Sequence, residues 1–230
     1  MWEEWKKFAA TAAVELVEPG MTVGLGSGTT MAEVVKALAR KKIKAKYVPS
    51  SEQIAKLASR LGLKLYELGG ELDLTIDGAD EIDTSFNMIK GKGGALTREK
   101  ILAKAAKKVV IVVDRTKLVK KLGKKNPIPV EVIPFSLRFT SEEIKRLGGK
   151  PELRLSDEKP FVTDNGNYIL DVRFKKITNP KSLEKKLNEI PGVVENGIFT
   201  DLADIVIVGH EGGYDVIKSK REFLGLFSKL

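Results

Sequence analysis

The sequence predicts an α/β fold: a Rossmann-like, mostly parallel sheet with helices on both faces, and a small ferredoxin-like α+β lobe inserted into it. Three observations support this prediction. Strand-like and helix-period segments alternate through the first half of the chain, which is the pattern of strand-helix-strand crossover units. Prolines then punctuate a strand-like stretch at 127–134. From there the order strand, helix, strand, strand, helix, strand is typical of a ferredoxin-like lobe.

The first half of the chain supplies the elements of the parallel sheet in order. Residues 3–17 carry apolar side chains at helical spacing, and Pro19 with Gly20 ends this first helix. A glycine-rich turn then separates the first strand from the second helix. The expected helices are 3–17, 30–39, 51–61 and 97–107, and the expected strands are 21–25, 46–49, 64–68, 72–76 and 109–113.

A second module is expected to begin near Asn126. Asn165-Gly166 between two β-rich runs predicts a hairpin within it. The expected helices of the second half are 141–147, 183–190 and 214–227, and the expected strands are 161–163, 168–171, 193–199 and 203–208. The last strand and helix return to the first sheet. We therefore expect a Rossmann-like domain made of 1–127 plus 203–230, and a small α+β lobe made of 128–202.

The composition narrows the classes to which the protein can belong. Apolar residues make up 42% of the 230 residues, and no apolar run approaches the roughly 20 residues that a membrane span needs. Acidic residues precede Lys6 and Lys7, which is the wrong order for a secretory signal, so we expect a cytoplasmic protein with no membrane partner. The absence of cysteine excludes disulfides and cysteine metal sites.

The net charge of +9 suits an anionic partner, either nucleic acid or a phosphorylated small molecule. Lysines gather at 41–46 and 120–125 without interleaved aromatic residues. We interpret these runs as solvated surface, and we expect a small-molecule partner and no nucleic acid.

A glycine-rich loop, Gly-Leu-Gly-Ser-Gly-Thr-Thr at 24–30, lies between an expected strand and an expected helix. Free backbone N–H groups and a helix N-terminus can hold an anion there, and the hydroxyl groups add donors. The loop lacks the Gly-Lys-Ser/Thr ending of a nucleotide-binding P-loop, and its spacing departs from the dinucleotide fingerprint. A small phosphate or carboxylate fits better, although a tight turn with an ordinary helix cap explains the loop equally well.

Four acidic residues, Asp77, Asp80, Glu81 and Asp83, follow the expected strand 72–76. The carboxyl ends of strands are where open α/β sheets bind their ligands. Crowded carboxylates repel one another, and this raises pKa values toward a range suited to proton exchange. We interpret Asp77 and Asp80 as functional and the other two as residues of a solvated turn; a divalent-cation site is the alternative.

The segment 90–100 supplies cations and a further acid. Lys90 can offset the aspartates and stabilise negative charge on a substrate oxygen. Glu99 opens a helix, where an acid also complements the helix dipole, and spacing alone favours that explanation. His210 is the only histidine, so a Ser-His-Asp relay or a multi-histidine metal site is not expected. Acid–base chemistry then depends on Asp, Glu, Lys or Tyr.

Taken together, the segments 24–30, 77–81 and 90–100 closely resemble the A-type ribose-5-phosphate isomerase family in residues, order and spacing. The segments 129–134, 162–167 and 190–194 are similar to later parts of the same family. The resemblance therefore covers nearly the whole chain.

This resemblance implies an enzyme that interconverts ribose 5-phosphate and ribulose 5-phosphate through an enediolate, in the non-oxidative branch of the pentose phosphate pathway. It implies that Glu99 is the base, which takes a proton from the carbon beside the carbonyl and returns it to the neighbouring carbon. Asp77, Asp80 and Lys90 match groups that assist ring opening and polarise the substrate oxygens. The family needs no metal or other cofactor and forms homodimers or homotetramers.

The resemblance also implies a set of substrate-binding residues. Hydroxyl groups of the glycine-rich loop orient the sugar end as much as the phosphate, and Lys6 and Lys117 resemble basic residues near the phosphate. The implied set is Lys6, Ser27, Gly28, Thr29, Thr30, Gly91, Lys92, Gly93, Gly94, Arg98 and Lys117. Ser27 and Thr29 swap hydroxyl types relative to the family, and Lys92 stands where glycine is common, which affects only local charge.

Two other classes stay open as alternatives. A sugar-phosphate-sensing regulator on a similar fold would suit the positive charge, but residues 1–20 leave no room for a DNA-reading module. A coenzyme A transferase-like enzyme also uses a glutamate near glycine-rich loops, but the segment 77–81 argues against it. Ligand binding without turnover would indicate the sensor, and a glutamyl thioester at Glu99 would indicate the transferase.

Overall fold

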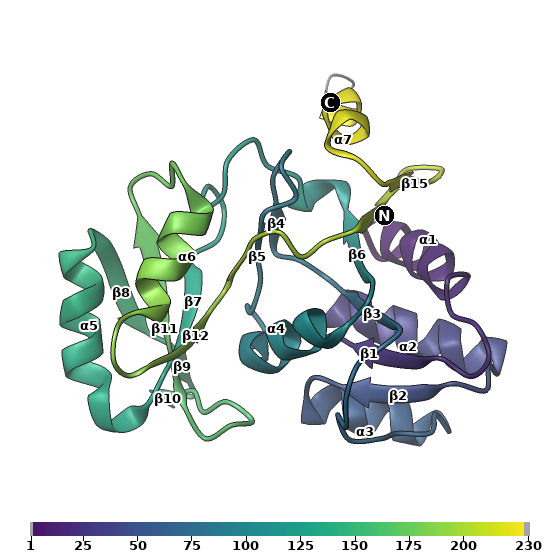
Figure 1. Ribbon diagram of the computed structural model, residues 1–230, viewed down its shortest axis with the longest axis horizontal. Helices are drawn as coiled ribbons and strands as arrows, with labels where there is room; N and C mark the ends of the chain where they lie inside the picture. Colours follow the sequence, from purple (N-terminus) through teal and green to yellow (C-terminus); the bar gives the residue numbers. More distant parts are fainter. Residues whose placement is uncertain (1, 228–230) are drawn as a thin grey trace.

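Runs of β-branched and apolar residues form a six-stranded sheet in the larger part of the molecule (Figure 1). The computed structural model describes residues 2–227. The strand order is β15-β14-β6-β3-β1-β2, and all neighbours are parallel except β14 and β15. These strands are β1 (Thr22–Leu25), β2 (Lys46–Pro49), β3 (Leu74–Asp77), β6 (Val109–Asp114), β14 (Ile205–His210) and β15 (Gly213–Ile217). The predicted α/β fold with a mostly parallel sheet is confirmed.

Both faces of this sheet are covered, because alternate residues of each strand point to opposite sides. In β6, Val110 and Val112 belong to one hydrophobic core, whereas Val109, Ile111 and Val113 belong to the other. The first core is shared with α1 (Trp2–Val14), α2 (Thr29–Lys41) and α3 (Glu52–Arg60). The second face is covered by α4 (Leu96–Ala105), α7 (Lys220–Phe227) and a small second sheet. Among residues 2–227, no helix has the length and apolar character to span a bilayer.

The second sheet joins three two-residue strands in the order β13-β5-β4. They are β4 (Glu81–Ile82), β5 (Met88–Ile89) and β13 (Ile198–Phe199). Strands this short leave no periodic signal in the sequence, so the sheet is not predicted by the pattern. It brings the chain that leaves the inserted lobe alongside the segment that leads to Lys90.

The inserted lobe has the β-α-β-β-α-β order and an antiparallel sheet, β12-β7-β11-β8, as a ferredoxin-like lobe requires. Its elements are β7 (Ile128–Val132), η2 (Pro134–Ser136), α5 (Leu137–Arg146), β8 (Gly149–Leu153), β9 (Leu155–Ser156), β10 (Lys159–Pro160), β11 (Tyr168–Phe174), α6 (Pro180–Asn188) and β12 (Val193–Asn196). The lobe has its own core, and it lies to one side of the larger sheet, with α4 between the two (Figure 1).

The predictions of strands at 64–68 and 161–163 are wrong. Residues 64–68 form only one bridge, from Leu65 to Tyr47 of β2. A longer ladder would need a backbone donor at position 49, and Pro49 has none. Residues 161–163 form no strand because β11 already pairs with β7 on one edge and β8 on the other. The turn at Gly166 is present, closed by its N–H donating to Thr163, but the hairpin of this region is β9–β10.

The expected helix 214–227 is wrong in its first part. Residues 213–217 form β15, which pairs antiparallel with β14 and places Ile217 in the core. The backbone hydrogen bonds that β15 makes with the edge of β14 outweigh the preference for a helix that the spacing of the apolar residues indicates. The helix α7 begins only at Lys220.

Candidate active site

The glycine-rich loop crosses the carboxyl ends of β1 and β3, two neighbouring strands of the sheet. The N–H of Gly26 donates to the carbonyl of Ile76 at 2.9 Å, which joins the two strand ends. A Cβ at position 26 would overlap the carboxylate of Asp77, so only glycine lets the loop pass this close. Helix α2 begins at Thr29, and its first backbone N–H groups therefore face the same place.

A buried triad of Asp77, Lys90 and Glu99 lies beneath this loop. Lys90 Nζ is 2.9 Å from Oδ2 of Asp77 and 3.2 Å from Oε2 of Glu99, and it donates to the carbonyl of Gly78 at 2.7 Å. No side chain of the triad is more than 5% exposed. One cation shared by two carboxylates leaves a buried excess of negative charge, which the uptake of a proton relieves.

The pKa values in this triad follow from its burial. Burial and the neighbouring charge of Asp77 raise the pKa of Glu99 to about 8, against the opposing effect of Lys90. Burial also raises the pKa of Asp77. Burial acts to lower the pKa of Lys90, but the charges of Asp77 and Glu99 outweigh it and raise that pKa. A carboxyl group that titrates near neutrality is suited to accept and return a proton.

Lys90 and Glu99 of the triad line a cavity of about 100 Å³. Most of the residues singled out from the sequence line it. They are Lys6, Ser27, Gly28, Thr29, Thr30, Asp80, Lys90, Gly91, Lys92, Gly93, Glu99 and Lys117. Gly78 and Ala79, which lie in the acidic segment 77–81 but are not singled out, complete the wall. The glycine-rich loop and the segments 78–80 and 90–93 therefore face one space.

Cations and hydroxyl groups surround this cavity. Lys6 Nζ donates to Oγ1 of Thr29 at 3.1 Å, which joins α1 to the start of α2. Ser27 and Ser50 share a hydrogen bond of 2.8 Å between their hydroxyl groups. Lys117 enters the wall from η1 (Arg115–Lys117), the short helix after β6. Such a set of N–H, hydroxyl and ammonium donors suits a phosphorylated, hydroxyl-rich ligand.

Three of the singled-out residues do not line the cavity. Asp77 lies behind Lys90, in contact with it. Gly94 faces the ring of Phe161 in the inserted lobe. Arg98 points to the same lobe, where its guanidinium donates to the side chain of Asn165 and to the carbonyl of Asp164, both at 2.7 Å.

The interpretation of Glu81 and Asp83 as residues of a solvated turn is wrong. Glu81 is fully buried, and its carboxylate accepts hydrogen bonds from the backbone N–H groups of Gly123, Lys125 and Asn126. Asp83 is also buried. Nothing near position 81 in the sequence indicates these partners, because they lie more than 40 residues away.

The described part of the chain, residues 2–227, contains no cluster of three or more histidine, aspartate or glutamate side chains placed to hold a metal ion. His210 lies at the β14–β15 turn, with its Nε2 3.3 Å from Asp215, and does not line the cavity. The positive charge beside Glu99 is the ammonium group of Lys90, 3.2 Å away.

Comparison with known proteins identifies two matching family models. The model described as ribose 5-phosphate isomerase A (phosphoriboisomerase A) matches residues 46–213. The model described as the DeoR C terminal sensor domain matches residues 3–85, which include the glycine-rich loop but not the segment 90–100.

Curated relatives and solved structures agree with the first model. Ribose-5-phosphate isomerase A of Thermosynechococcus vestitus is 47% identical over 90% of this chain and 92% of its own length. That of Pyrococcus horikoshii is 44% identical over 92% of this chain and 96% of its own. A solved structure of ribose 5-phosphate isomerase A from Methanocaldococcus jannaschii covers 94% of this chain and 99% of its own, with 43% identity and a TM-score of 0.90. A D-ribose-5-phosphate isomerase in complex with phospho-erythronic acid covers 95% and 100%, with 42% identity and a TM-score of 0.92.

Proposed function

Because the chain belongs to the ribose 5-phosphate isomerase A family, we propose that its buried triad and cavity carry out the family's reaction with Glu99 as the base. The protein is a ribose-5-phosphate isomerase of the pentose phosphate pathway. One observation carries the assignment of the base: Glu99 is a buried carboxyl group with a raised pKa, in contact with Lys90 at the wall of the cavity.

In the proposed reaction the sugar binds in its open-chain form. Glu99 takes the proton from C2 of the aldose, the electrons of the C2–H bond form a C1–C2 double bond, and the carbonyl electrons move to O1. The proton of the C2 hydroxyl passes to O1, and Glu99 returns its own proton to C1, which gives the ketose. The ammonium group of Lys90 stabilises the negative charge of the enediolate, because it is fixed and desolvated next to Glu99.

The two aspartates have separate proposed roles. Asp80 lines the cavity and accepts the backbone N–H of Lys92 at 2.9 Å. Its proposed role is to exchange a proton with the ring oxygen as the sugar opens. Asp77 lies behind Lys90 and holds its ammonium group toward the cavity. With Lys90 as the electrophile, we expect the reaction to need no metal or other cofactor.

Binding is assigned to the donors around the cavity. We propose that Lys6 and Lys117 hold the phosphate and that Ser27, Thr29 and Thr30 contact the sugar. Phospho-erythronic acid, bound by the relative with 42% identity, is then expected to bind here as well, because its carboxylate resembles the enediolate. Arg98 is occupied by Asp164 and Asn165, and we assign it to holding the inserted lobe rather than the phosphate.

The substitution Glu99→Gln tests the assignment of the base. It keeps the size and polarity of the side chain but removes its ability to take a proton. We expect kcat to fall by about 10²- to 10⁴-fold while KM changes little. The measurement is the interconversion of ribose 5-phosphate and ribulose 5-phosphate by purified protein.

Glu52→Gln is the matched control, because Glu52 also lies in the first turn of a helix but is exposed, with only a 3.6 Å ion pair to Lys56. Its activity is expected to equal that of the parent. Parent-like turnover by Glu99→Gln would remove Glu99 as the base. Phosphosugar binding without turnover by the parent protein would instead favour the sensor class matched by residues 3–85.

At the level of the whole protein, we propose that residues 1–127 with 203–230 form the catalytic domain and that 128–202 form the inserted lobe. We further propose a cytoplasmic homodimer or homotetramer that acts on a phosphosugar and binds neither nucleic acid nor membranes.

A further inference from the structure

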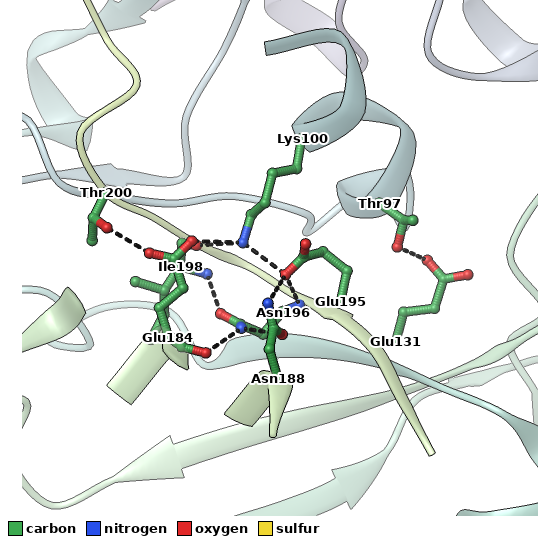
Figure 2. Close-up of polar contacts among 9 residues, drawn as sticks. All are labelled: Thr97, Lys100, Glu131, Glu184, Asn188, Glu195, Asn196, Ile198 and Thr200. Atoms are coloured by element: carbon green, nitrogen blue, oxygen red, sulfur yellow. Dashed lines mark hydrogen bonds and ion pairs between the residues drawn. The ribbon is translucent and has the colours of Figure 1, made fainter. Parts of the chain in front are cut away.

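Helix α4 carries the proposed base, and its neighbouring polar residues reach in a different direction. Figure 2 shows the side chains of Thr97 and Lys100 extending from this helix toward residues of the inserted lobe and the chain that leaves it. The hydroxyl of Thr97 donates to the carboxylate of Glu131 in β7. Glu99 lies between these two anchored positions and alone of the three lines the cavity.

The ammonium group of Lys100 is buried and fully engaged. Nζ lies 2.9 Å from Glu184 of α6, 2.9 Å from Glu195 of β12 and 2.7 Å from the carbonyl of Ile198, so its three N–H donors each have an acceptor. It also lies 4.7 Å from the ring centre of Phe199. The side chain of Lys100 is only 6% exposed.

The segment 195–198 that Lys100 contacts also pairs with the segment that bears Lys90 of the active site. The N–H of Lys90 donates to the carbonyl of Gly197 at 2.9 Å, and β5, which precedes Lys90, pairs with β13. Both ammonium groups contact the ring of Phe199, whose centre is 5.4 Å from Lys90 Nζ and 4.7 Å from Lys100 Nζ. Lys100 therefore links the helix that bears Glu99 to the segment that supports Lys90.

The carboxylates around Lys100 are themselves held in place. Oε1 of Glu195 also accepts the side-chain amide of Asn188 and the backbone N–H of Asn196, each at 2.8 Å. The side chain of Asn196 in turn accepts the N–H of Ile198. A buried ion cluster of this kind adds little net stability, since desolvation offsets the attraction, but it fixes the geometry of the elements it joins.

Building on the proposed role of Glu99, we propose that Lys100 is a positioning residue for the isomerisation: its three contacts fix α4 against α6 and the segment 195–198, so that Glu99 and Lys90 meet at the cavity wall. Lys100 does not touch the substrate in this proposal. It acts through the two residues that do.

The first test is Lys100→Met, which keeps the length of the side chain and removes its donors. We expect kcat to fall by about 10- to 100-fold, the effect of a small misplacement of catalytic groups, while KM stays within about threefold. Lys104→Met is the matched control, because Lys104 lies one turn later on the same helix and is exposed. Its kcat and KM are expected to equal those of the parent.

Lys100→Met also leaves two half-buried carboxylates without their cation, so a second variant separates positioning from charge balance. In Lys100→Met/Glu184→Gln/Glu195→Gln the three charges are removed together, which restores folding but not the anchoring of α4. We expect a melting temperature close to that of the parent and a kcat as low as that of Lys100→Met. Parent-like kcat in this folded triple variant would show that Lys100 only balances charge, and the proposal would be overturned.

If the triple variant does not fold, Glu195→Ala gives the decision, because it removes one of the three acceptors of Lys100 while the contacts with Glu184 and Ile198 keep the cation balanced. A lowered kcat with unchanged KM supports the proposal, and unchanged kinetics overturn it. The test of Lys100 can fail without affecting the conclusion from Glu99→Gln, and the reverse also holds. An inactive Glu99→Gln together with fully active Lys100 variants rejects the positioning role alone, whereas an active Glu99→Gln rejects the base itself.

Discussion

At the residue scale, the active site depends on charges that burial has removed from water. Glu99 and Lys100 are adjacent in the chain and both buried, yet Glu99 faces a site with excess negative charge and Lys100 faces two carboxylates that neutralise it. Burial, together with the charge of Asp77, raises the pKa of Glu99 to about 8. The two residues thus place one reactive and one fixed charge within a single helical turn.

The raised pKa of Glu99 predicts the pH dependence of the reaction. The base acts when it is ionised, so kcat/KM should rise as pH increases through about 8. At lower pH, kcat/KM should be inversely proportional to the proton concentration. In Asp77→Asn the neighbouring negative charge is lost, which favours ionised Glu99. The acid limb of the profile should then move to lower pH, without reaching that of an exposed glutamate, because burial persists.

The measurement is kcat/KM between pH 5.5 and 9.5 for both proteins. Asp77→Asn should also lower the maximum rate, because Lys90 loses one of its supports. If the acid limb lies at the same pH in both proteins, the charge of Asp77 does not affect the pKa of the catalytic base. Glu52→Gln, with its exposed substitution, should leave the profile unchanged.

At the scale of elements, α4 is held mainly by polar contacts on the side of the inserted lobe. Glu131 of β7 is fully buried and accepts hydrogen bonds from Thr97 at the start of the helix, and from Thr163, Asn165 and Asn167 of the lobe loop. A carboxylate can accept hydrogen bonds from all four donors at once. The side-chain amide of a glutamine at this position would instead direct its own N–H groups at some of these donors.

We therefore expect Glu131→Gln to lower the free energy of unfolding by about 1–3 kcal/mol, the cost of unsatisfied buried donors near a charged acceptor. The measurement is urea unfolding followed by circular dichroism. Glu152→Gln, at an exposed position of β8 in the same lobe, is the control and should change stability little. Equal unfolding free energies for the two variants would mean that the Glu131 network contributes nothing to the fold.

At the scale of the whole molecule, contacts between the two lobes surround the active site. Arg154 of the inserted lobe, paired with Asp171, donates to the carbonyls of Gly91 and Lys92 in the cavity wall. The side chain of Asp164 accepts the N–H of Glu52 at the start of α3. Together with the contacts of α4, these bonds make the lobe a support for several parts of the site.

This arrangement predicts that the two lobes unfold together. Trp2 and Trp5, the only tryptophans, lie in α1 of the larger domain, so their fluorescence reports that domain, whereas far-ultraviolet circular dichroism reports both. The two signals should give the same denaturant midpoint. A circular dichroism change that precedes the fluorescence change would show that the inserted lobe unfolds alone.

The sequence by itself determined the strand-helix alternation, the order of the inserted lobe and the segments 24–30, 77–81 and 90–100. These features depend on local chemistry: periodicity selects helices and strands, and glycines mark the places where the backbone must turn or approach closely. Such signals are missing for the two-residue strands. Local sequence signals were misleading at 64–68 and 214–217, where backbone pairing at the sheet edges decided the secondary structure.

Only the tertiary structure decided which charges are buried and with which partners. From the sequence, Glu81 is interpreted as part of a solvated turn, but it is enclosed by backbone N–H groups. Lys100 is not singled out from the sequence, and it contacts Glu184 and Glu195, more than 80 residues away. A pKa depends on burial and on every neighbouring charge, and these are set by the packing of distant segments. For that reason the sequence identifies Glu99 as a candidate, and the packing around it makes it a base.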